Sequence, residues 1–298
     1  MTQRFFISLS ISILFSISLS AQQEIKIWGD NPVSGKMKRS ILTVFQAKEN
    51  PSGISVIVCP GGSYRYLDKK GEGYKVAQWL NENNITAFVL FYRRGLFGNR
   101  HPAMIQDLQR AKQIVKENSQ KFDVNPDKIG VMGFSAGGHL AGTAGTYFDI
   151  NFLEEFGVTP QVCLRPSFVS MIYPVVTMTD ESIVHTKSRK NLLSSAYSSE
   201  LARKMSLELN VRRDMPPVFL VHCIDDKTVD YRNATNYMAR LQEKGVSNFF
   251  ELYNECGHGF GVNPKMREGA NEAPLWTQLF ISWIEETLSI QLKSETFQ

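Results

Sequence analysis

Residues 129–141 read IGVMGFSAGGHLA, an apolar run that meets a glycine-flanked serine and continues into small residues. Within this stretch, residues 133–137 fit the pattern G-x-S-x-G, in which a strand turns sharply into a helix and carries a serine at the tip. The flanking positions need glycine because a Cβ there would strike the neighbouring strand and helix. The N-terminus of the following helix offers free N–H groups and a positive dipole to a developing anion. The pattern predicts a nucleophile at Ser135, and an ordinary strand–turn–helix is the alternative.

Apolar runs and helical periodicity alternate on both sides of this turn. We expect buried strands at residues 54–59, 85–92, 168–176, 218–223 and 248–253, after two early strands at 24–28 and 39–46. We expect helices at residues 72–83, from Pro102 onward, at 231–241 and at 276–283. This alternation indicates an α/β fold, with a mostly parallel sheet covered by helices on both faces. Ligands of such sheets bind at the carboxyl ends of the strands.

Composition places the chain among globular proteins and excludes some functions. The 298 residues are 43% hydrophobic and 21% charged, which suits one large α/β domain over residues 22–298. The net charge is +4 and the basic residues are scattered, which excludes a nucleic-acid-binding surface. The four cysteines have no metal-ligand spacing, so no metal is expected. The sequence leaves open whether Cys223 and Cys256 pair.

The N-terminal residues have a different character from the rest. Arg4 precedes an apolar, serine-rich run over residues 5–19, and no acid occurs before Glu24. This pattern predicts a secretory signal peptide over residues 1–21, with an N-terminal β-strand as the alternative. The run is too short and too rich in serine for a membrane span. We therefore expect a secreted or periplasmic protein with no membrane contact in its mature form.

A nucleophilic serine needs a base within hydrogen-bond reach and an acid that orients the base. His258 is the candidate base, because it follows a predicted strand near the C-terminus and has glycine on both sides. The other four histidines are interpreted as structural: His101, His139, His185 and His222. The acid is expected after the strand at residues 218–223. We select Asp226, with Asp225 and Asp230 as alternatives. The resulting order is serine, acid, histidine.

An oxyanion in this chemistry requires two preorganised donors, which backbone N–H groups supply. One is expected from Ala136, the residue that follows the nucleophile. The other is expected from Gly62 or Ser63, in the loop after the strand at residues 54–59. The glycines of this loop allow its backbone to approach a substrate carbonyl closely. Tyr64 and Tyr66 follow directly, and we predict that their rings wall the acyl pocket together with the polar segment 177–213, interpreted as a cap-like excursion over the sheet.

Five motifs together resemble one group of enzymes: CPGGSY at residues 59–64, GFSAGGHLA at 133–141, YPV at 173–175, VHCIDD at 221–226 and GHGF at 257–260. They are similar to bacterial acetyl esterases related to acetylxylan esterases, within the α/β-hydrolase superfamily. The similarity runs from about Ile27 to the last helix. The resemblance implies that Ser135 is the nucleophile, Asp226 the acid and His258 the base. The chain departs from the family pattern at three positions, Ser63, Cys223 and Cys256, and none of them removes a catalytic group.

The sequence thus predicts a secreted serine esterase that uses no cofactor and acts on a small-molecule or oligosaccharide ester. The resemblance implies acetylated xylan or related plant oligosaccharides as the substrate. A feruloyl or general short-chain carboxylesterase is the nearest alternative. A serine peptidase is less favoured because such enzymes usually carry a large extra domain. A hydrolase fold retained as a binding module is disfavoured by the complete set of Ser135, Asp226 and His258.

Overall fold

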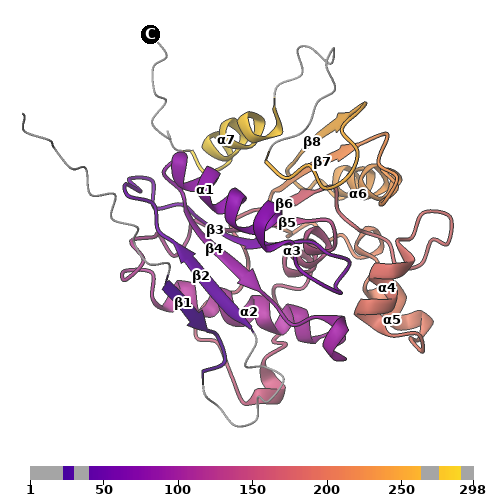
Figure 1. Ribbon diagram of the computed structural model, residues 1–298, viewed down its shortest axis with the longest axis horizontal. Coiled ribbons are helices and arrows are strands. Elements are labelled where there is room, and N and C mark those ends of the chain that lie inside the picture. Colours follow the sequence, from indigo (N-terminus) through magenta and orange to yellow (C-terminus); the bar gives the residue numbers. More distant parts are fainter. Residues whose placement is uncertain (1–22, 30–39, 263–274, 290–298) are drawn as a thin grey trace, which may run out of the picture.

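The computed structural model describes residues 23–29, 40–262 and 275–289. The predicted signal peptide at residues 1–21 lies outside the described residues. Figure 1 shows a central sheet flanked by helices. None of the helices in the described segments combines the length and the apolar character needed to cross a lipid bilayer.

The eight strands of the sheet have the order β1-β2-β4-β3-β5-β6-β7-β8. Their bounds are β1 Gln23–Lys26, β2 Ile41–Phe45, β3 Ser55–Cys59, β4 Thr86–Phe91, β5 Ile129–Phe134, β6 Val169–Ile172, β7 Val218–Cys223 and β8 Asn248–Tyr253. β2 pairs antiparallel with both β1 and β4, and all pairings from β4 to β8 are parallel. The predicted fold class, a mostly parallel α/β-hydrolase sheet, is confirmed.

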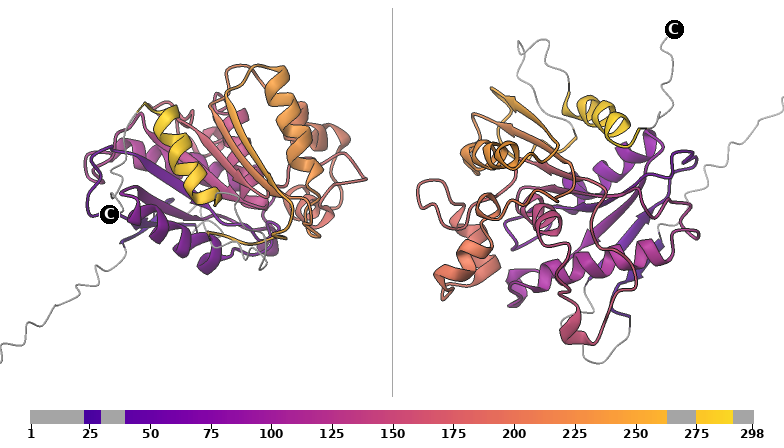
Figure 2. Two further views of the ribbon diagram at one scale, coloured as in Figure 1. Left: turned by 90° about the horizontal axis from the view of Figure 1, so that it is seen from above. Right: turned by 180° about the vertical axis from the view of Figure 1, so that it is seen from behind.

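Helices cover both faces of the sheet, as Figure 2 shows. They are α1 Lys75–Glu82, α2 Ala103–Glu117, α3 Ala136–Thr146, α4 Thr186–Leu193, α5 Ser199–Lys204, α6 Arg232–Glu243 and α7 Trp276–Thr287. On one face the ring of Phe168 packs against α7, and α7 in turn contacts α1 through Trp79. On the other face Val169 and Met171 lie against glycines of α3, and α2 packs on α3.

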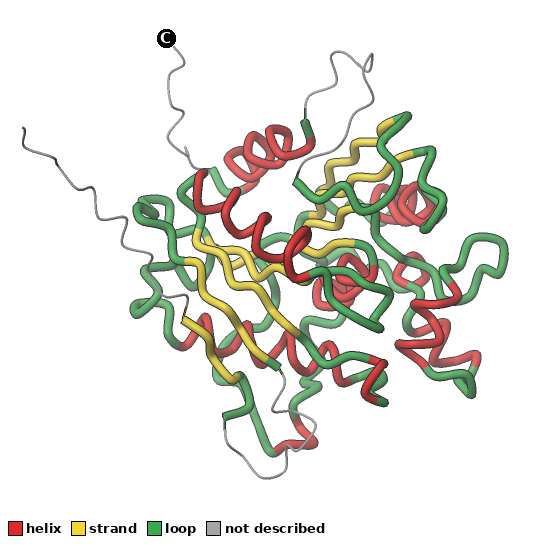
Figure 3. Tube along the Cα trace, in the orientation of Figure 1, coloured by secondary structure: helices red, strands yellow, loops and turns green. Residues whose placement is uncertain are grey.

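Every residue of β3, β4, β5 and β7 is buried, which explains why their sequences are continuous apolar runs. Figure 3 shows these strands between the two helical layers. Their carboxyl ends lie at one edge of the sheet because the strands are parallel. The loops that follow β3, β5, β7 and β8 therefore meet at this edge, and they carry the predicted site residues.

Three elements differ from the sequence-based expectation. The strand expected over residues 168–176 ends at Ile172, because Tyr173 adopts a left-handed backbone conformation with φ of 39°. The helix expected at residues 72–83 opens with a π-helical turn over Lys69–Tyr74. The excursion at residues 177–213 contains α4, which was not predicted because its polar sequence has little apolar periodicity.

Candidate active site

The turn between β5 and α3 holds Ser135 with φ of 53° and ψ of −119°, a backbone conformation that non-glycine residues rarely adopt. The flanking glycines make this turn possible. A Cβ on Gly133 would lie 2.0 Å from the carbonyl oxygen of Gly137, and a Cβ on Gly137 would lie 2.0 Å from that of Cys59. Both contacts involve backbone atoms, which cannot move aside. The strand, the helix and the loop after β3 are thus packed directly around the serine.

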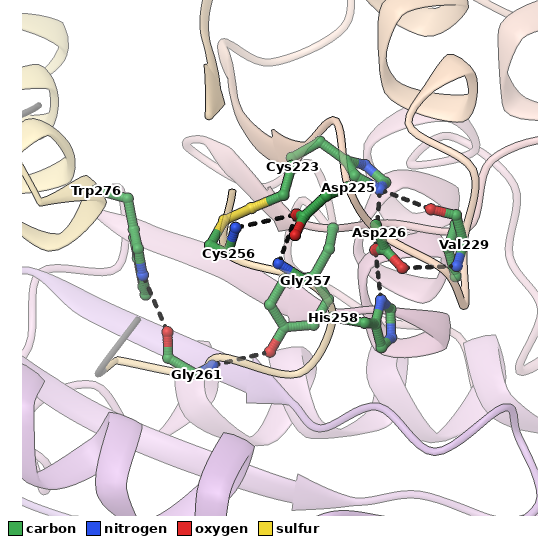
Figure 4. The surroundings of a disulfide bond; sticks show 11 residues. Cys223, Asp225, Asp226, Val229, Cys256, Gly257, His258, Gly261 and Trp276 are labelled. Carbon is green, nitrogen blue, oxygen red and sulfur yellow. Dashed lines mark hydrogen bonds and ion pairs between the residues drawn. A yellow bond between two sulfur atoms is a disulfide. The ribbon is translucent and has the colours of Figure 1, made fainter. Parts of the chain in front are cut away.

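Three predicted side chains from three separate loops meet at this turn. His258 Nε2 lies 3.0 Å from Ser135 Oγ, and His258 Nδ1 lies 2.6 Å from Asp226 Oδ2. Figure 4 shows the imidazole of His258 directed at the Asp226 carboxylate. The two alternative acids have other partners. Asp225 accepts hydrogen bonds from the backbone N–H groups of residues 256 and 257, and Asp230 pairs with Arg232.

Both carboxylate oxygens of Asp226 have hydrogen-bond partners. Its Oδ1 accepts hydrogen bonds from the N–H groups of Thr228 and Val229, at 2.8 and 2.9 Å. Its Oδ2 also lies 3.2 Å from Nε2 of the buried His222. Burial alone would raise the pKa of Asp226, but the hydrogen bonds from His222 and His258 outweigh it and hold the pKa below its usual range. The acid therefore stays ionised beside His258. His222, interpreted from the sequence as structural, is a partner of Asp226, the predicted acid.

A cavity of about 420 Å³ opens above the serine. It is lined by Gly62, Ser63, Tyr66, Leu67, Asp68, Glu72, Ser135, Thr228, His258 and Gly259. No described residue accepts a hydrogen bond from the N–H of Gly62 or Ser63. The N–H of Ala136 lies in the first turn of α3, where helical N–H groups have no intrahelical acceptor. The three predicted oxyanion donors thus come from the loop after β3 and from the first turn of α3.

The BD-FAE family profile matches residues 42–241. The chain belongs to the BD-FAE family. It is 32% identical over 217 residues to an acetylxylan esterase of Xylanibacter ruminicola, a match covering 72% of this chain and 42% of that protein. It is 28% identical over 209 residues to endo-1,4-beta-xylanase B of Butyrivibrio fibrisolvens, covering 70% of this chain and 32% of that one. The chain thus spans less than half the length of these two relatives.

Among solved structures, this BD-FAE protein is similar to an acetyl ester-xyloside bifunctional hydrolase from Caldicellulosiruptor lactoaceticus. The TM-score is 0.79 with 30% sequence identity, and the match covers 90% of this chain and 97% of that chain. The likeness extends over nearly the whole fold of both proteins. The resemblance drawn from the five sequence motifs, to α/β-hydrolase esterases related to acetylxylan esterases, is confirmed.

The two tyrosines expected to wall the pocket have different positions. Tyr66 lines the cavity, and 52% of the residue is exposed. Tyr64 is fully buried, and its hydroxyl bonds His139 Nδ1 of α3 at 2.8 Å. The expectation that Tyr64 lines the pocket therefore does not hold. Its left-handed backbone, with φ of 57°, turns the ring into the core beneath the loop.

The excursion at residues 177–213 supports the site from behind the same loop. In α4, the side-chain amide of Asn191 donates a hydrogen bond to the carbonyl oxygen of Ser63 at 2.9 Å. None of the described residues that line the cavity belongs to this excursion. The segment expected as an acyl-pocket wall instead fixes the backbone of a predicted oxyanion donor.

Cys223 at the end of β7 forms a disulfide with Cys256, which lies two residues before His258 (Figure 4). The bond ties the loop that carries Asp226 to the loop that carries His258. Spacing alone left this pairing open. Within residues 23–29, 40–262 and 275–289, no group of histidine, cysteine and acidic side chains is arranged to hold a metal ion.

Proposed function

We propose that this BD-FAE protein is a serine carboxylic-ester hydrolase that removes acetyl groups from acetylated xylan or related plant oligosaccharides. The observation that carries the proposal is the hydrogen-bonded series Asp226–His258–Ser135, whose serine lies at a strained turn and faces a cavity. The acetyl group and the xylan substrate are supported by the names of the Xylanibacter and Caldicellulosiruptor proteins and by the five motifs.

In the proposed mechanism, the Ser135 hydroxyl attacks the ester carbonyl carbon as its proton passes to His258 Nε2. Asp226 accepts a hydrogen bond from His258 Nδ1 and stabilises the imidazolium. Its low pKa keeps it ionised at this step. The N–H of Ala136, with that of Gly62 or Ser63, binds the oxyanion. His258 then protonates the departing alcohol, and water releases acetate from the acyl-enzyme by the reverse proton transfers.

Substrate choice is tested on one purified preparation with nitrophenyl acetate, butyrate and octanoate, methyl ferulate, and acetylated xylo-oligosaccharides. Tyr66 is a bulky side chain at the cavity, and steric overlap rejects added methylenes more strongly than an unfilled pocket does. We expect acetate to be released from the oligosaccharides, and kcat/KM to fall more than about tenfold from acetyl to butyryl esters. Octanoate turnover at or above that of acetate would favour a general carboxylesterase, and preferred turnover of methyl ferulate a feruloyl esterase.

We also propose that the protein is exported with cleavage near residue 21. The basic residue, apolar run and small residues at the N-terminus support this proposal. N-terminal sequencing of the protein from the secreted or periplasmic fraction tests it. A mature chain that begins close to residue 22 is expected, whereas an intact Met1 in a cytoplasmic protein would contradict export.

A further inference from the structure

Glu72 is a buried carboxylic acid beside the nucleophile that the proposed mechanism does not use. Only 5% of the residue is exposed, and it forms part of the cavity wall. Its Oε2 accepts a hydrogen bond from the N–H of Gly61 at 2.7 Å. A Cβ on Gly61 would lie 2.7 Å from that oxygen and 2.9 Å from Ser135 Cβ. The carboxylate and the nucleophile thus pack against the same glycine, at the start of the proposed oxyanion hole.

The second oxygen of Glu72 leads to the loop that carries His258. Glu72 Oε1 accepts a hydrogen bond from the Tyr173 hydroxyl at 2.8 Å, and that hydroxyl accepts one from the N–H of Gly261 at 3.2 Å. The Tyr173 ring lies 4.7 Å from the His258 ring, centroid to centroid. One tyrosine therefore contacts both the base and the backbone three residues beyond it.

The far end of this series is also anchored. Trp276 of α7 donates a hydrogen bond from Nε1 to the carbonyl oxygen of Gly261 at 2.9 Å, which Figure 4 shows. Gly261 is thus held through both its N–H and its carbonyl group. The series Gly61–Glu72–Tyr173–Gly261 joins two loops that are far apart in the sequence.

Burial of the Glu72 carboxyl lowers the stability of the folded protein. Burial raises the pKa of Glu72, and the hydrogen bonds from Tyr173 and Gly61 oppose the rise without cancelling it. An acid whose pKa is raised on folding destabilises the folded state once pH exceeds its usual pKa, because the unfolded chain ionises more readily. An apolar residue at position 72 would avoid this cost, but it would break the link between the two loops.

We propose that Glu72 and Tyr173 are positioning residues that lock the oxyanion loop, residues 60–63, to the histidine loop, residues 254–262. The inference rests on the proposed esterase function. The lock keeps the Gly62 and Ser63 N–H groups and the His258 imidazole in register, so that the donors meet the oxyanion as the base takes the proton. Glu72 transfers no proton and touches no reacting atom in this account.

The test compares variants that break the link with one that preserves it. Tyr173→Phe removes the hydroxyl and keeps the ring against His258, whereas Glu72→Leu removes both acceptors. Glu72→Gln keeps an oxygen for Gly61, and its amide can donate to the Tyr173 oxygen. With nitrophenyl acetate, we expect Tyr173→Phe and Glu72→Leu to lower kcat by about 10- to 100-fold with KM changed less than about threefold, since small misplacements at this scale are costly. Glu72→Gln should stay within about fivefold of wild type, and the double variant should be no worse than the poorer single variant.

Tyr237→Phe is the matched control, because it deletes a buried tyrosine hydroxyl on α6, in neither of the two loops. Its kcat should equal that of wild type. All rates are taken per folded molecule, with the folded fraction measured by circular dichroism. Wild-type kcat in both Tyr173→Phe and Glu72→Leu would overturn the lock and leave the esterase proposal intact. So would a loss of rate that only follows the loss of folded protein. A wild-type protein without ester turnover would overturn both proposals.

Discussion

Ser135 Oγ and His258 Nε2 lie 3.0 Å apart, but the turn and the loop that carry them are held in different ways. Around Ser135 the restraint is steric, and it comes from backbone atoms packed directly against the turn. Gly133 and Gly137 leave no room for a Cβ, since each would have a backbone oxygen at 2.0 Å. The serine is fixed by the packing of one strand, one helix and the end of β3.

The histidine loop has open space around the two glycines that flank His258. A Cβ on Gly257 or Gly259 would meet nothing within 4 Å, and both residues use positive φ, of 65° and 76°. The loop is held instead by separate long-range ties: the disulfide, the Asp225 carboxylate, the Tyr173 hydroxyl and the Trp276 indole. A bulkier residue in the turn at Ser135 should therefore unfold the protein, whereas the loss of one tie of the histidine loop should lower activity only in part.

The largest expected difference is between Gly137→Ala and Gly257→Ala. The added methyl at position 137 meets backbone atoms that cannot move aside, so we expect a loss of more than about 4 kcal/mol in the free energy of unfolding. At position 257 the cost is only that of a left-handed alanine, about 1 kcal/mol. Urea unfolding of both variants measures the difference. Equal destabilisation of the two variants would contradict the claim that backbone packing restrains the turn at Ser135.

Removal of the disulfide by Cys223→Ser with Cys256→Ser comes next. The bond closes a loop with a sequence separation of 33, so its loss should lower the free energy of unfolding by about 3–4 kcal/mol. We expect kcat/KM to fall by about tenfold in the folded fraction, because Asp225, Asp226 and Tyr173 still hold the histidine loop. A matched substitution of the unpaired, exposed Cys163 by serine should leave kcat/KM unchanged. Full activity without the disulfide would show that the tie does not position His258.

Acidification should lower stability through His139, in the helix that follows Ser135, at a higher pH than through Asp226, the partner of His258. Burial lowers the pKa of His139 in α3 to about 4, from an ordinary value of 6.5. Below pH 6.5 the unfolded chain binds this proton and the folded protein does not, so stability falls with a slope of up to about 1.4 kcal/mol per pH unit until pH reaches about 4. Asp226, whose pKa is lowered, starts to cost stability only below its ordinary value of 3.8. Urea midpoints from pH 7 to 4 should fall less steeply in His139→Gln, and the slope that remains comes from His101 and His185, whose pKa values burial also lowers to about 4. An unchanged slope would contradict the assignment to His139.

The smallest expected effect is that of Asp225→Ala. Its carboxylate accepts hydrogen bonds from the N–H groups of Cys256 and Gly257, at 3.0 and 2.8 Å. Loss of both should lower kcat/KM by about three- to tenfold, while the disulfide keeps the loop in place. Asp225→Asn retains an acceptor oxygen and should recover most of the rate. A loss as large as that of Asp226→Ala would mean that Asp225 is the functional acid.

The difference between local sequence patterns and contacts between distant residues also determines which features the sequence could predict. The strands, the turn at Ser135 and the choice of Asp226 and His258 rest on apolar runs, glycine positions and chain order, which are local patterns. Contacts between distant residues leave no such pattern. Tyr173 and Glu72 are separated by 101 positions, and Asn191 and Ser63 by 128. The burial of Tyr64 depends likewise on His139, which lies on another element.

The central claim, that Ser135 is a nucleophile activated by His258, is tested most directly by covalent labelling. Wild-type protein is treated with a fluorophosphonate, mapped by mass spectrometry and assayed with nitrophenyl acetate beside Ser135→Ala. We predict one label on Ser135, loss of turnover in proportion to labelling, and a kcat lower by about five to six orders of magnitude in a folded Ser135→Ala protein. A label on another residue, or near-wild-type turnover by folded Ser135→Ala, would contradict the account.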